Sequence, residues 1–283
     1  MSKKNIQELN DKPQNFSQTN FFDAYPAFYK TGTAGMDYTR LNSRYMALIN
    51  HNKQIINNSS ILDLASHDGR WSFAAIKNGA NKVFGIEIED GLAKNSLENF
   101  KKYEVPNEKY SFIVGDLFEE IKKLKPKEFD VVFCFGIFYH IMNHMQLIRE
   151  IKRLEPKYLI LDTEVTISKH PIIRIHQEIP PITDPLIPND RYIVGRPSKS
   201  GIEMMLKAIG FDFQYYDWRN SGLIKTTGLE EYDSKKSILL KKALRYGISL
   251  ITDSKPKRKH HLHQLARYIT TKRITIVAKN LSL

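Results

Sequence analysis

The chain has 283 residues, 41% of them hydrophobic and 26% charged, which is enough to bury a large core in one or two domains. Its apolar runs are too short to cross a bilayer and its first residues lack the apolar core of a signal peptide, so we expect a cytoplasmic protein with no membrane partner. The single cysteine, Cys134, excludes an intrachain disulfide and a cysteine-rich metal site, and we expect no metal.

The formal net charge of +12 is concentrated at one end of the chain. From Lys255 onward there are eight lysines and arginines and no acid, at positions 255, 257, 258, 259, 267, 272, 273 and 279. The stretch KPKRKHHLH within this tail is typical of a patch that binds the phosphates of nucleic acid or another anionic surface. A solvated basic loop is the alternative interpretation of the same residues.

The first part of the chain divides into a polar and a periodic segment. Residues 1–20 are polar and show no periodicity, which predicts a disordered N-terminus. Residues 21–57 predict a helical N-terminal cap, because apolar side chains recur there at helical spacing, at Leu41, Tyr45, Leu48 and Ile49. We expect the main domain to follow over residues 58–283.

Strands and helices alternate from residue 58 to residue 165. Apolar runs predict strands at 60–65, 82–89, 110–116, 129–139 and 157–165. Helices are predicted between several of them, with Gly79 ending one and Asp90 and Asn143 capping the starts of two others. Because the strands lack in–out alternation, they predict a parallel sheet covered by helices on both faces.

The pattern is interrupted twice in the second half of the chain. Residues 166–197 carry prolines at 171, 180, 181, 185, 188 and 197, which argue against a helix or a central strand and predict an inserted loop that covers the site as a lid. Regular structure returns with a helix over 197–210, capped by Ser198, and with strands at 211–218 and 272–279. Residues 219–271 form a second, basic insertion.

The turn after the first predicted strand, ASHDG (65–69), is the strongest candidate for a binding element. Ligands of open α/β sheets bind beyond the carboxyl ends of the strands, where a helix start offers backbone N–H groups. The acids Glu87 and Glu89 end the second strand, where a carboxylate takes the hydroxyls of a ribose. Only Gly69 remains of a glycine-rich turn, and Asp68 repels phosphate, so we expect a cationic nucleoside without phosphates, S-adenosylmethionine.

Two further strand ends bring polar groups to the same edge of the sheet. Asp116 ends the third strand, where its carboxylate can accept from an adenine amino group. The end of the fourth strand brings Gly136, Tyr139 and His140 to this edge. Three neighbouring strand ends that each carry suitable groups favour a cofactor site over a chance motif.

On these residues the sequence resembles class I S-adenosylmethionine-dependent methyltransferases. The resemblance covers 55–165, 196–218 and 272–280, and it implies an α/β, Rossmann-like, seven-stranded and mostly parallel sheet with helices on both faces. Its last strand would be antiparallel and inserted between strands five and six. In the family's first motif an acid is followed by three alternate glycines; Asp63 and Gly69 match, while Ala65 and His67 replace the first two glycines.

The resemblance also implies roles for individual residues. Asp63 would lie near the methionine amino group of the cofactor, Glu87 would bind the ribose, and Asp116 with Leu117 would hold the adenine. The methionine end would be lined by Phe135 and Gly136. The full set of implied cofactor-binding positions is Asp63, Ala65, Ser66, His67, Gly69, Glu87, Ile88, Asp116, Leu117, Phe135 and Gly136.

Within this superfamily three stretches are similar to the tRNA wobble-uridine methyl/carboxymethyl transferase branch. They are ILDLASHDGRWSFAAIKNGANKVFGIE, FDVVFCFGIFYH and RPSKSGIEMMLKAIGF. An Asp-Gly followed by an aromatic residue, a Tyr-His after the fourth strand and a Pro-Ser before the late helix recur in that branch. Relatives with this pattern include small-molecule methyltransferases, so the resemblance leaves the substrate open.

Methyl transfer requires alignment of a nucleophile with the methyl group, and a base only if the nucleophile must lose a proton. His140 is the candidate base and Tyr139 a candidate for orienting the substrate, although both positions also suit packing residues. Substrate contacts are predicted for two histidines of the lid, His170 and His176. Two arginines one helical turn apart in the N-terminal cap, Arg40 and Arg44, are candidates for binding an anionic substrate. The alternative interpretation is that they are surface charges.

Three functions are consistent with these sequence features. The first is methyl transfer to an oxygen or nitrogen of a small molecule, and the second is a tRNA wobble-uridine-type transfer in which the basic region 235–273 binds RNA. The third is a non-enzymatic binding module on a degenerate methyltransferase fold, suggested by the missing glycines. We favour the first over the second, because few aromatic residues are interleaved with the basic tail as base stacking requires.

Overall fold

The computed structural model describes residues 20–32, 38–178, 193–218 and 272–282. The predicted disordered N-terminus, apart from Asn20, and the basic insertion 219–271 lie outside these residues, as does the proposed RNA-binding region apart from Lys272 and Arg273. Among the helices that the structure describes, none has both the length and the apolarity needed to traverse a bilayer.

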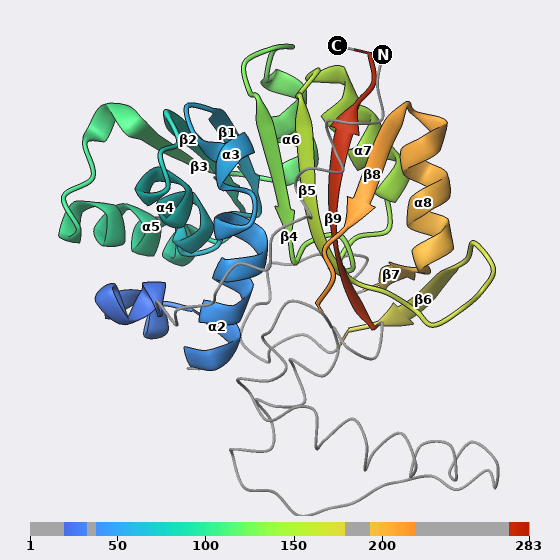
Figure 1. Ribbon diagram of the computed structural model, residues 1–283, viewed down its shortest axis with the longest axis horizontal. Helices are drawn as coiled ribbons and strands as arrows, with labels where there is room; N and C mark the ends of the chain where they lie inside the picture. Colours follow the sequence, from blue (N-terminus) through green and yellow to red (C-terminus); the bar gives the residue numbers. More distant parts are fainter. Residues whose placement is uncertain (1–19, 33–37, 179–192, 219–271, 283) are drawn as a thin grey trace, which may run out of the picture.

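Seven strands form one mixed sheet in the order β3-β2-β1-β4-β5-β9-β8. Their bounds are β1 Ser60–Leu64, β2 Lys82–Glu87, β3 Tyr110–Val114, β4 Val131–Phe135, β5 Tyr158–Glu164, β8 Phe211–Tyr215 and β9 Arg273–Asn280. Strand β9 pairs antiparallel with both β5 and β8, whereas β1 to β5 pair in parallel. In Figure 1, β4, β5 and β8 point downward and β9 points upward. The predicted seven-stranded Rossmann-like sheet, with the last strand antiparallel and inserted, is confirmed.

Helices cover both faces of this sheet, as predicted. On one face, α6 (Leu117–Lys123), α7 (His144–Arg153) and α8 (Lys199–Ala208) share a hydrophobic core with strand residues such as Leu62 and Val132. On the other face, α4 (Arg70–Lys77) and α5 (Asp90–Lys102) pack on residues such as Ile61 and Phe133. Alternate residues of β1 and β4 therefore enter different cores, which explains why these strands are apolar throughout.

The described helix starts agree with the predicted caps in part. Ser198 is the N-cap of α8, and its side chain accepts the backbone N–H of Gly201. Asn143 is the N-cap of α7 but makes no capping hydrogen bond with its side chain. Asp90 is the first helical residue of α5 and not its cap; Glu89 holds the cap position, where its carbonyl accepts from Leu92 and Ala93.

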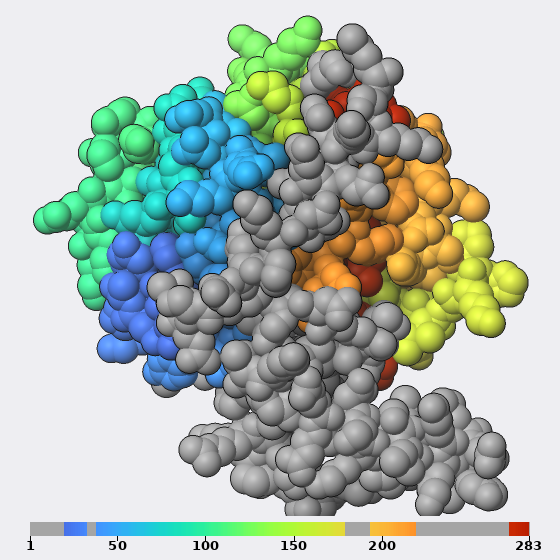
Figure 2. Space-filling view, viewed as in Figure 1, coloured from blue at the N-terminus to red at the C-terminus, as the bar shows by residue number. Residues whose placement is uncertain are grey.

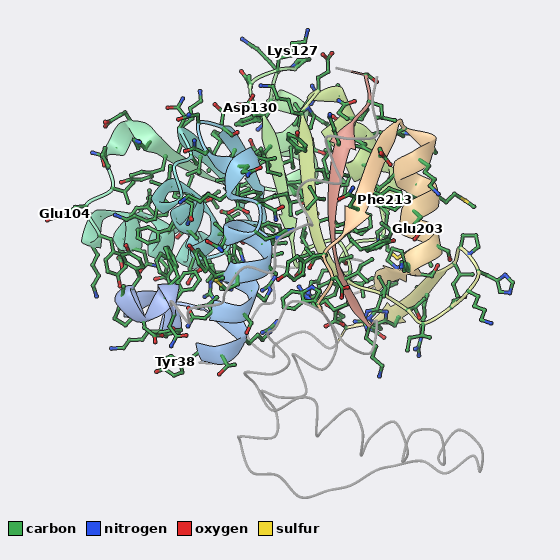
Figure 3. All side chains as sticks on the ribbon, viewed as in Figure 1. Tyr38, Glu104, Lys127, Asp130, Glu203 and Phe213 are labelled. Atoms are coloured by element: carbon green, nitrogen blue, oxygen red, sulfur yellow. The ribbon has the colours of Figure 1, made fainter. Side chains whose placement is uncertain are left out.

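The segment before the sheet is made of short helical elements where it is described. These are η1 Phe21–Ala24, η2 Pro26–Tyr29, α2 Tyr38–Tyr45, η3 Met46–Asn50 and α3 Lys53–Ile56. Phe22 and Phe28 are fully buried and belong to the same hydrophobic core as Phe73 of α4. In Figure 3, Tyr38 at the start of α2 lies at the lower end of the molecule, whereas Asp130, just before β4, lies at the upper end. Helix α2 therefore lies at the end where the parallel strands finish.

The insertion predicted as a loop contains two strands. β6 (Ile173–Gln177) and β7 (Ile193–Pro197) pair antiparallel as a separate two-stranded ribbon, so the prediction of an irregular segment over 166–197 was wrong for these ten residues. Pro171 and Pro197 are compatible with it, because Pro171 precedes the ribbon and Pro197 ends β7. Figures 1 and 2 show the ribbon and the N-terminal cap on opposite sides of the lower end.

Candidate cofactor and substrate site

A pocket of about 500 Å³ lies at the carboxyl ends of β1, β2 and β4. Four parts of the chain line it: the N-terminal cap, the turn after β1 with the start of α4, the end of β2 with the start of α5, and the segment after β4. Their lining residues are Phe28, Tyr29, Arg40, Leu41 and Arg44, then Ala65, His67, Arg70 and Trp71, then Glu87, Ile88, Glu89 and Leu92, and finally Phe135, Gly136, Ile137, Tyr139 and His140.

The turn after β1 keeps a left-handed backbone at every position where the resembled motif has glycine. The φ angles are 54° at Ala65, 56° at His67 and 74° at Gly69. A residue with a side chain loses about 1–2 kcal/mol in this region relative to the right-handed one, although histidine is found there more often than most residues. The two glycine replacements have therefore left the course of the backbone intact and added local strain.

Glu87 joins this turn to the end of β2. Its carboxylate accepts the backbone N–H of His67 at 2.7 Å, of Ile88 at 2.9 Å and of Glu89 at 3.0 Å. The residue is 5% exposed and lines the pocket. A carboxylate offers about four acceptor positions, so three backbone donors leave it able to accept from a ligand hydroxyl.

Asp63 lies beneath the turn and does not line the pocket. It is fully buried, and its carboxyl accepts from the Ser72 hydroxyl at 2.7 Å. Burial raises the pKa of Asp63 to about 7, against the opposing effect of the Ser72 hydrogen bonds. Close to neutral pH this group is therefore divided between its acid and carboxylate forms.

Asp68 is a buried carboxylate whose charge is compensated within the protein. Arg70 donates to it through Nε at 2.6 Å and Nη2 at 2.7 Å, and the Thr31 hydroxyl donates at 2.6 Å. Although burial raises its pKa, the charge of Arg70 and the hydrogen bonds that Arg70 donates hold the pKa of Asp68 well below its usual range. Asp68 therefore does not repel phosphate as the sequence predicted, because Arg70 neutralises its charge.

The structure brings only part of the predicted cofactor set to the pocket wall. Ala65, His67, Glu87, Ile88, Phe135 and Gly136 line it, whereas Asp63, Ser66, Gly69, Asp116 and Leu117 do not. Asp116 is the N-cap of α6, a helix additional to those predicted, and accepts the backbone N–H of Phe118 at 2.8 Å. Ser66 is buried behind the turn.

Tyr139 and His140 both line the pocket after β4. His140 Nδ1 lies 2.7 Å from Glu178 Oε2, and His176 Nε2 lies 3.9 Å from the other oxygen of that carboxylate. Burial raises the pKa of Glu178, but the hydrogen bond and charge of His140 outweigh it and lower the pKa. His176 therefore lies close to Glu178 but does not line the pocket. His170 is exposed and does not line the pocket either.

The two predicted arginines line the pocket from α2. Arg44 is also part of the protein's interior, because its Nη2 donates to Asp162 at 2.8 Å and its guanidinium lies 4.9 Å from the centre of the Trp71 ring. Asp162 accepts in addition from Arg273 and Thr275. Burial raises the pKa of Asp162, but the charges of Arg273 and Arg44 outweigh it and lower the pKa to about 2.

Several residues of the site were not predicted from the sequence. Arg70 and Trp71 follow the turn directly, and the aromatic residue after Asp-Gly was the only local signal for Trp71. Glu178 lies 38 residues from His140, and Arg273 lies 111 residues from Asp162. No sequence spacing indicates such pairs, because folding alone brings them together.

Comparison with known proteins agrees with this architecture. Residues 55–180 match the family model described as a methyltransferase domain, whose implied cofactor is S-adenosylmethionine. None of the curated proteins matches the sequence.

Three solved structures illustrate the structural likeness. The [4+2]-cyclase SpnF is 14% identical with a TM-score of 0.50, and the match covers 92% of this chain and 94% of that one. A chain of the Haloferax volcanii complex between the Trm112 methyltransferase activator and a methyltransferase is 13% identical with a TM-score of 0.50, covering 91% and 96%. A Mesorhizobium loti S-adenosylmethionine-dependent methyltransferase is 14% identical with a TM-score of 0.49, covering 84% and 98%. At these identities the likeness concerns the fold alone, and one of the three is named as a cyclase.

Proposed function

We propose that the chain is an S-adenosylmethionine-dependent methyltransferase that acts on an oxygen or nitrogen of a small molecule. The observation that carries the proposal is the buried Glu87 carboxylate, which lines the pocket beside a turn with left-handed backbone at Ala65, His67 and Gly69. The family match over residues 55–180 supports the same conclusion.

The residues of the pocket fit this cofactor. Glu87 offers an acceptor to the ribose hydroxyls, and Ile88 and Leu92 offer apolar surface for the adenine ring. Phe135 and Gly136 line the part of the wall that would adjoin the methionine end, and the cavity is of the size usual for small-molecule sites. When bound, the cofactor supplies a methyl group on a sulfonium sulfur.

His140 is the proposed base, and Glu178 positions it. A carboxylate that accepts from Nδ1–H fixes the tautomer in which Nε2 carries the lone pair, and it stabilises the imidazolium that forms when Nε2 takes a proton. Tyr139, whose ring centre lies 4.0 Å from that of His140, would orient the acceptor. This arrangement serves an acceptor whose hydroxyl or N–H must lose its proton as the methyl group is transferred.

One observation on the basic tail favours a small-molecule substrate over a tRNA substrate. Arg273, one of its eight basic residues, is 3% exposed and pairs with the buried Asp162, so it contributes to folding and not to a phosphate-binding surface. The pocket is also lined by Tyr29 and Leu41 of the N-terminal cap, which suits a compact acceptor.

The first experiment is a calorimetric titration of S-adenosylhomocysteine into the protein and into Glu87→Gln. We expect binding by the wild-type protein and a loss of about tenfold to a hundredfold in Glu87→Gln, because a hydrogen bond to a charged group contributes about 1.5–3 kcal/mol. Glu98→Gln, an equal change at an exposed position of α5, is the control and should bind as the wild type does.

If the wild-type protein does not bind S-adenosylhomocysteine, the proposed methyltransferase function is wrong and the chain is better explained as a non-enzymatic binding module. Equal affinity in Glu87→Gln and Glu98→Gln would show that the ribose lies elsewhere in the pocket.

A further inference from the structure

Outside the residues proposed to hold the cofactor, the pocket wall is mainly aromatic and aliphatic. These lining residues are Phe28, Tyr29, Leu41, Trp71, Ile137 and Tyr139. Arg44 and Arg70 also line this part, but they pair with the buried carboxylates of Asp162 and Asp68. Arg40 is engaged within the protein as well. The wall therefore offers a ligand mostly ring and aliphatic surface, which favours a flat apolar body.

The indole N–H of Trp71 is a polar group of this wall that the protein leaves unused. Trp71 lines the pocket and is 5% exposed. Its N–H donates to no acceptor among the described residues and is not fully enclosed by them. By contrast, the N–H of the second tryptophan, Trp218, donates to Thr275 at 3.0 Å. Because a buried tryptophan N–H usually has a partner, we expect the ligand of the pocket to bring an acceptor.

The Trp71 ring is held in one orientation by its neighbours. Its centre lies 4.9 Å from the Arg44 guanidinium, and the rings of Phe22 and Phe135 pack edge to face against it at 5.9 Å and 6.0 Å. Arg44 is itself fixed by its hydrogen bond to Asp162. A donor whose direction is set before binding loses little conformational entropy when the ligand binds. Trp71 is therefore suited to select a ligand with an acceptor at one position.

Tyr139 supplies a second ring from the neighbouring strand. It follows β4, which pairs with β1, the strand before Trp71. The guanidinium groups of Arg273 and Arg196 lie 5.3 Å and 5.7 Å from its ring centre. Tyr139 and Trp71 line the same pocket but make no ring contact with each other in the described part of the chain. A flat ligand can therefore pack on Tyr139 while its edge faces the Trp71 N–H.

His140 carries the second unused polar atom of this wall. Its Nδ1 lies 2.7 Å from Glu178, whereas its Nε2 has no partner among the described residues. With the proton on Nδ1, Nε2 accepts a hydrogen bond from the ligand. A phenol hydroxyl has a pKa of about 10, far closer to neutral pH than that of an aliphatic alcohol, so an imidazole base suits a phenol.

We propose that the acceptor substrate is a phenol, a flat aromatic ring with a hydroxyl group, that also carries a neutral hydrogen-bond acceptor such as a ketone. The Trp71 N–H donates to this acceptor, the hydroxyl donates to His140 Nε2, and the ring packs on Tyr139. During transfer the phenol oxygen forms a bond to the methyl carbon, the sulfur keeps the electron pair of the broken carbon–sulfur bond, and the phenol proton goes to His140 Nε2. The inference rests on the proposed methyltransferase function and names the substrate class of the same site.

The test compares hydroxyacetophenone with two probes of matched shape. Ethylphenol lacks the ketone, and acetylcyclohexanol lacks the flat ring. The meta and para isomers of hydroxyacetophenone are both measured, and the tighter one is compared with probes of the same substitution. The protein is saturated with S-adenosylhomocysteine, and binding is followed by NMR through the indole N–H signals, of which a Trp218→Phe variant leaves only that of Trp71.

We expect hydroxyacetophenone to shift the Trp71 N–H signal downfield and saturably, because a hydrogen-bonded proton is deshielded. It should bind about threefold to tenfold more tightly than ethylphenol, through the hydrogen bond from Trp71. A similar preference over acetylcyclohexanol is expected from packing on the Tyr139 ring. Equal binding of the three probes, or an unshifted Trp71 signal at saturation, would overturn the proposal.

Two variants and one control assign these preferences to their residues. Trp71→Phe keeps a ring but removes the N–H, so it should bind hydroxyacetophenone and ethylphenol equally. Tyr139→Leu should lose the preference for the flat ring and keep the preference for the ketone. Trp218→Phe, the same change at a buried tryptophan outside the pocket lining, should keep both preferences. A ketone preference of wild-type size in Trp71→Phe would contradict the inference, and the shift of the wild-type signal tests it without any change at Trp71.

The cofactor also carries acceptors, so the titration with S-adenosylhomocysteine alone is the second arm. An unshifted Trp71 N–H signal, with unchanged affinity in Trp71→Phe, supports a contact with the acceptor substrate. A downfield shift by S-adenosylhomocysteine together with a loss of affinity in Trp71→Phe assigns the N–H to the cofactor and overturns the inference. If the wild-type protein does not bind S-adenosylhomocysteine, the proposed function fails; if it binds and does not discriminate among the probes, the inference alone fails.

Discussion

At the scale of single residues, the turn after β1 shows that the fold can impose a left-handed backbone conformation for which the family motif uses glycine. Ala65 and His67 adopt left-handed φ angles without being glycine. The N–H of His67 donates to Glu87, and its carbonyl accepts from the Ser96 hydroxyl. These contacts hold the turn in a conformation that alanine and histidine do not favour on their own.

This strain predicts that Ala65→Gly stabilises the protein. Glycine relieves the steric conflict at φ 54°, while its greater freedom in the unfolded chain offsets part of the gain, so we expect the free energy of unfolding to rise by up to about 1 kcal/mol. Urea titration measures the change. Ala208→Gly, at the exposed last residue of α8, is the control and should lower stability by several tenths of a kcal/mol. A similar loss at both positions would contradict the strain at Ala65.

A second prediction at this scale concerns the pH dependence of stability. The pKa of Asp63 rises from its ordinary 3.8 to about 7 through burial. Between these values the folded protein holds a proton that the unfolded chain has released, so this group makes the free energy of unfolding fall as the pH rises from about 4 to about 7. Asp63→Asn removes the titrating group, and the variant should lose less stability than the wild type between pH 4.5 and pH 7.5.

Urea unfolding of both proteins at the two pH values measures this difference. Asp212→Asn, an exposed acid on β8, is the control and should follow the wild-type pH dependence. Identical pH dependence in the wild type and Asp63→Asn would show that Asp63 ionises in the folded protein as it does in the unfolded chain.

At the scale of elements, one buried carboxylate connects three parts of the fold. Asp162 of β5 accepts from Arg44 of α2 and from Arg273 and Thr275 of β9. It therefore joins the N-terminal cap and the last strand to the centre of the sheet, directly behind the pocket wall.

We expect Asp162→Asn to lower the free energy of unfolding by about 3–5 kcal/mol, because two arginines lose a buried counter-charge. The pKa of Asp162 is lowered, so its contribution is complete above its unfolded value near 4 and is lost as the pH falls toward 2. Urea unfolding at neutral pH is the measurement. Asp130→Asn at the opposite end of the sheet, where the ion pair with Lys157 is more exposed, should cost about 1 kcal/mol (Figure 3). An equal cost at both positions would refute the role of the buried network.

A second link between elements joins the β6–β7 ribbon to the segment that carries Tyr139 and His140. His144, buried at the start of α7, lies with Nε2 2.9 Å from the carbonyl oxygens of Phe138 and Gly195. The Gly195 N–H in turn donates to Ile141. Burial lowers the pKa of His144, which favours the neutral ring with its proton on Nε2. The ribbon thus supports the proposed catalytic segment from behind.

At the scale of the whole molecule, the sheet order explains why the pocket lies where it does. Strand β1 lies between β2 and β4, so the chain reverses direction across the sheet after β3. Connections that leave the carboxyl ends of β1 and β4 diverge to opposite faces and open a crevice between them. The N-terminal cap supplies Arg40 and Arg44 of α2 to the wall of the pocket. Figure 1 shows α2 at the lower end of the molecule, where β4 and β5 finish.

The sequence alone determined the local features of this protein. Continuous apolar runs predicted the central strands and the Ser198 cap predicted the start of α8, because each depends on neighbouring residues. The binding role of the acid at the end of β2 stays a prediction. The seven-stranded order followed from family resemblance. Only the tertiary structure decided which charges are compensated: Arg70 neutralises Asp68, and Arg44 meets Asp162 across 118 positions of the chain. It likewise imposed the left-handed turn without its glycines and the paired ribbon, since contacts between distant segments supply the energy that local preference lacks.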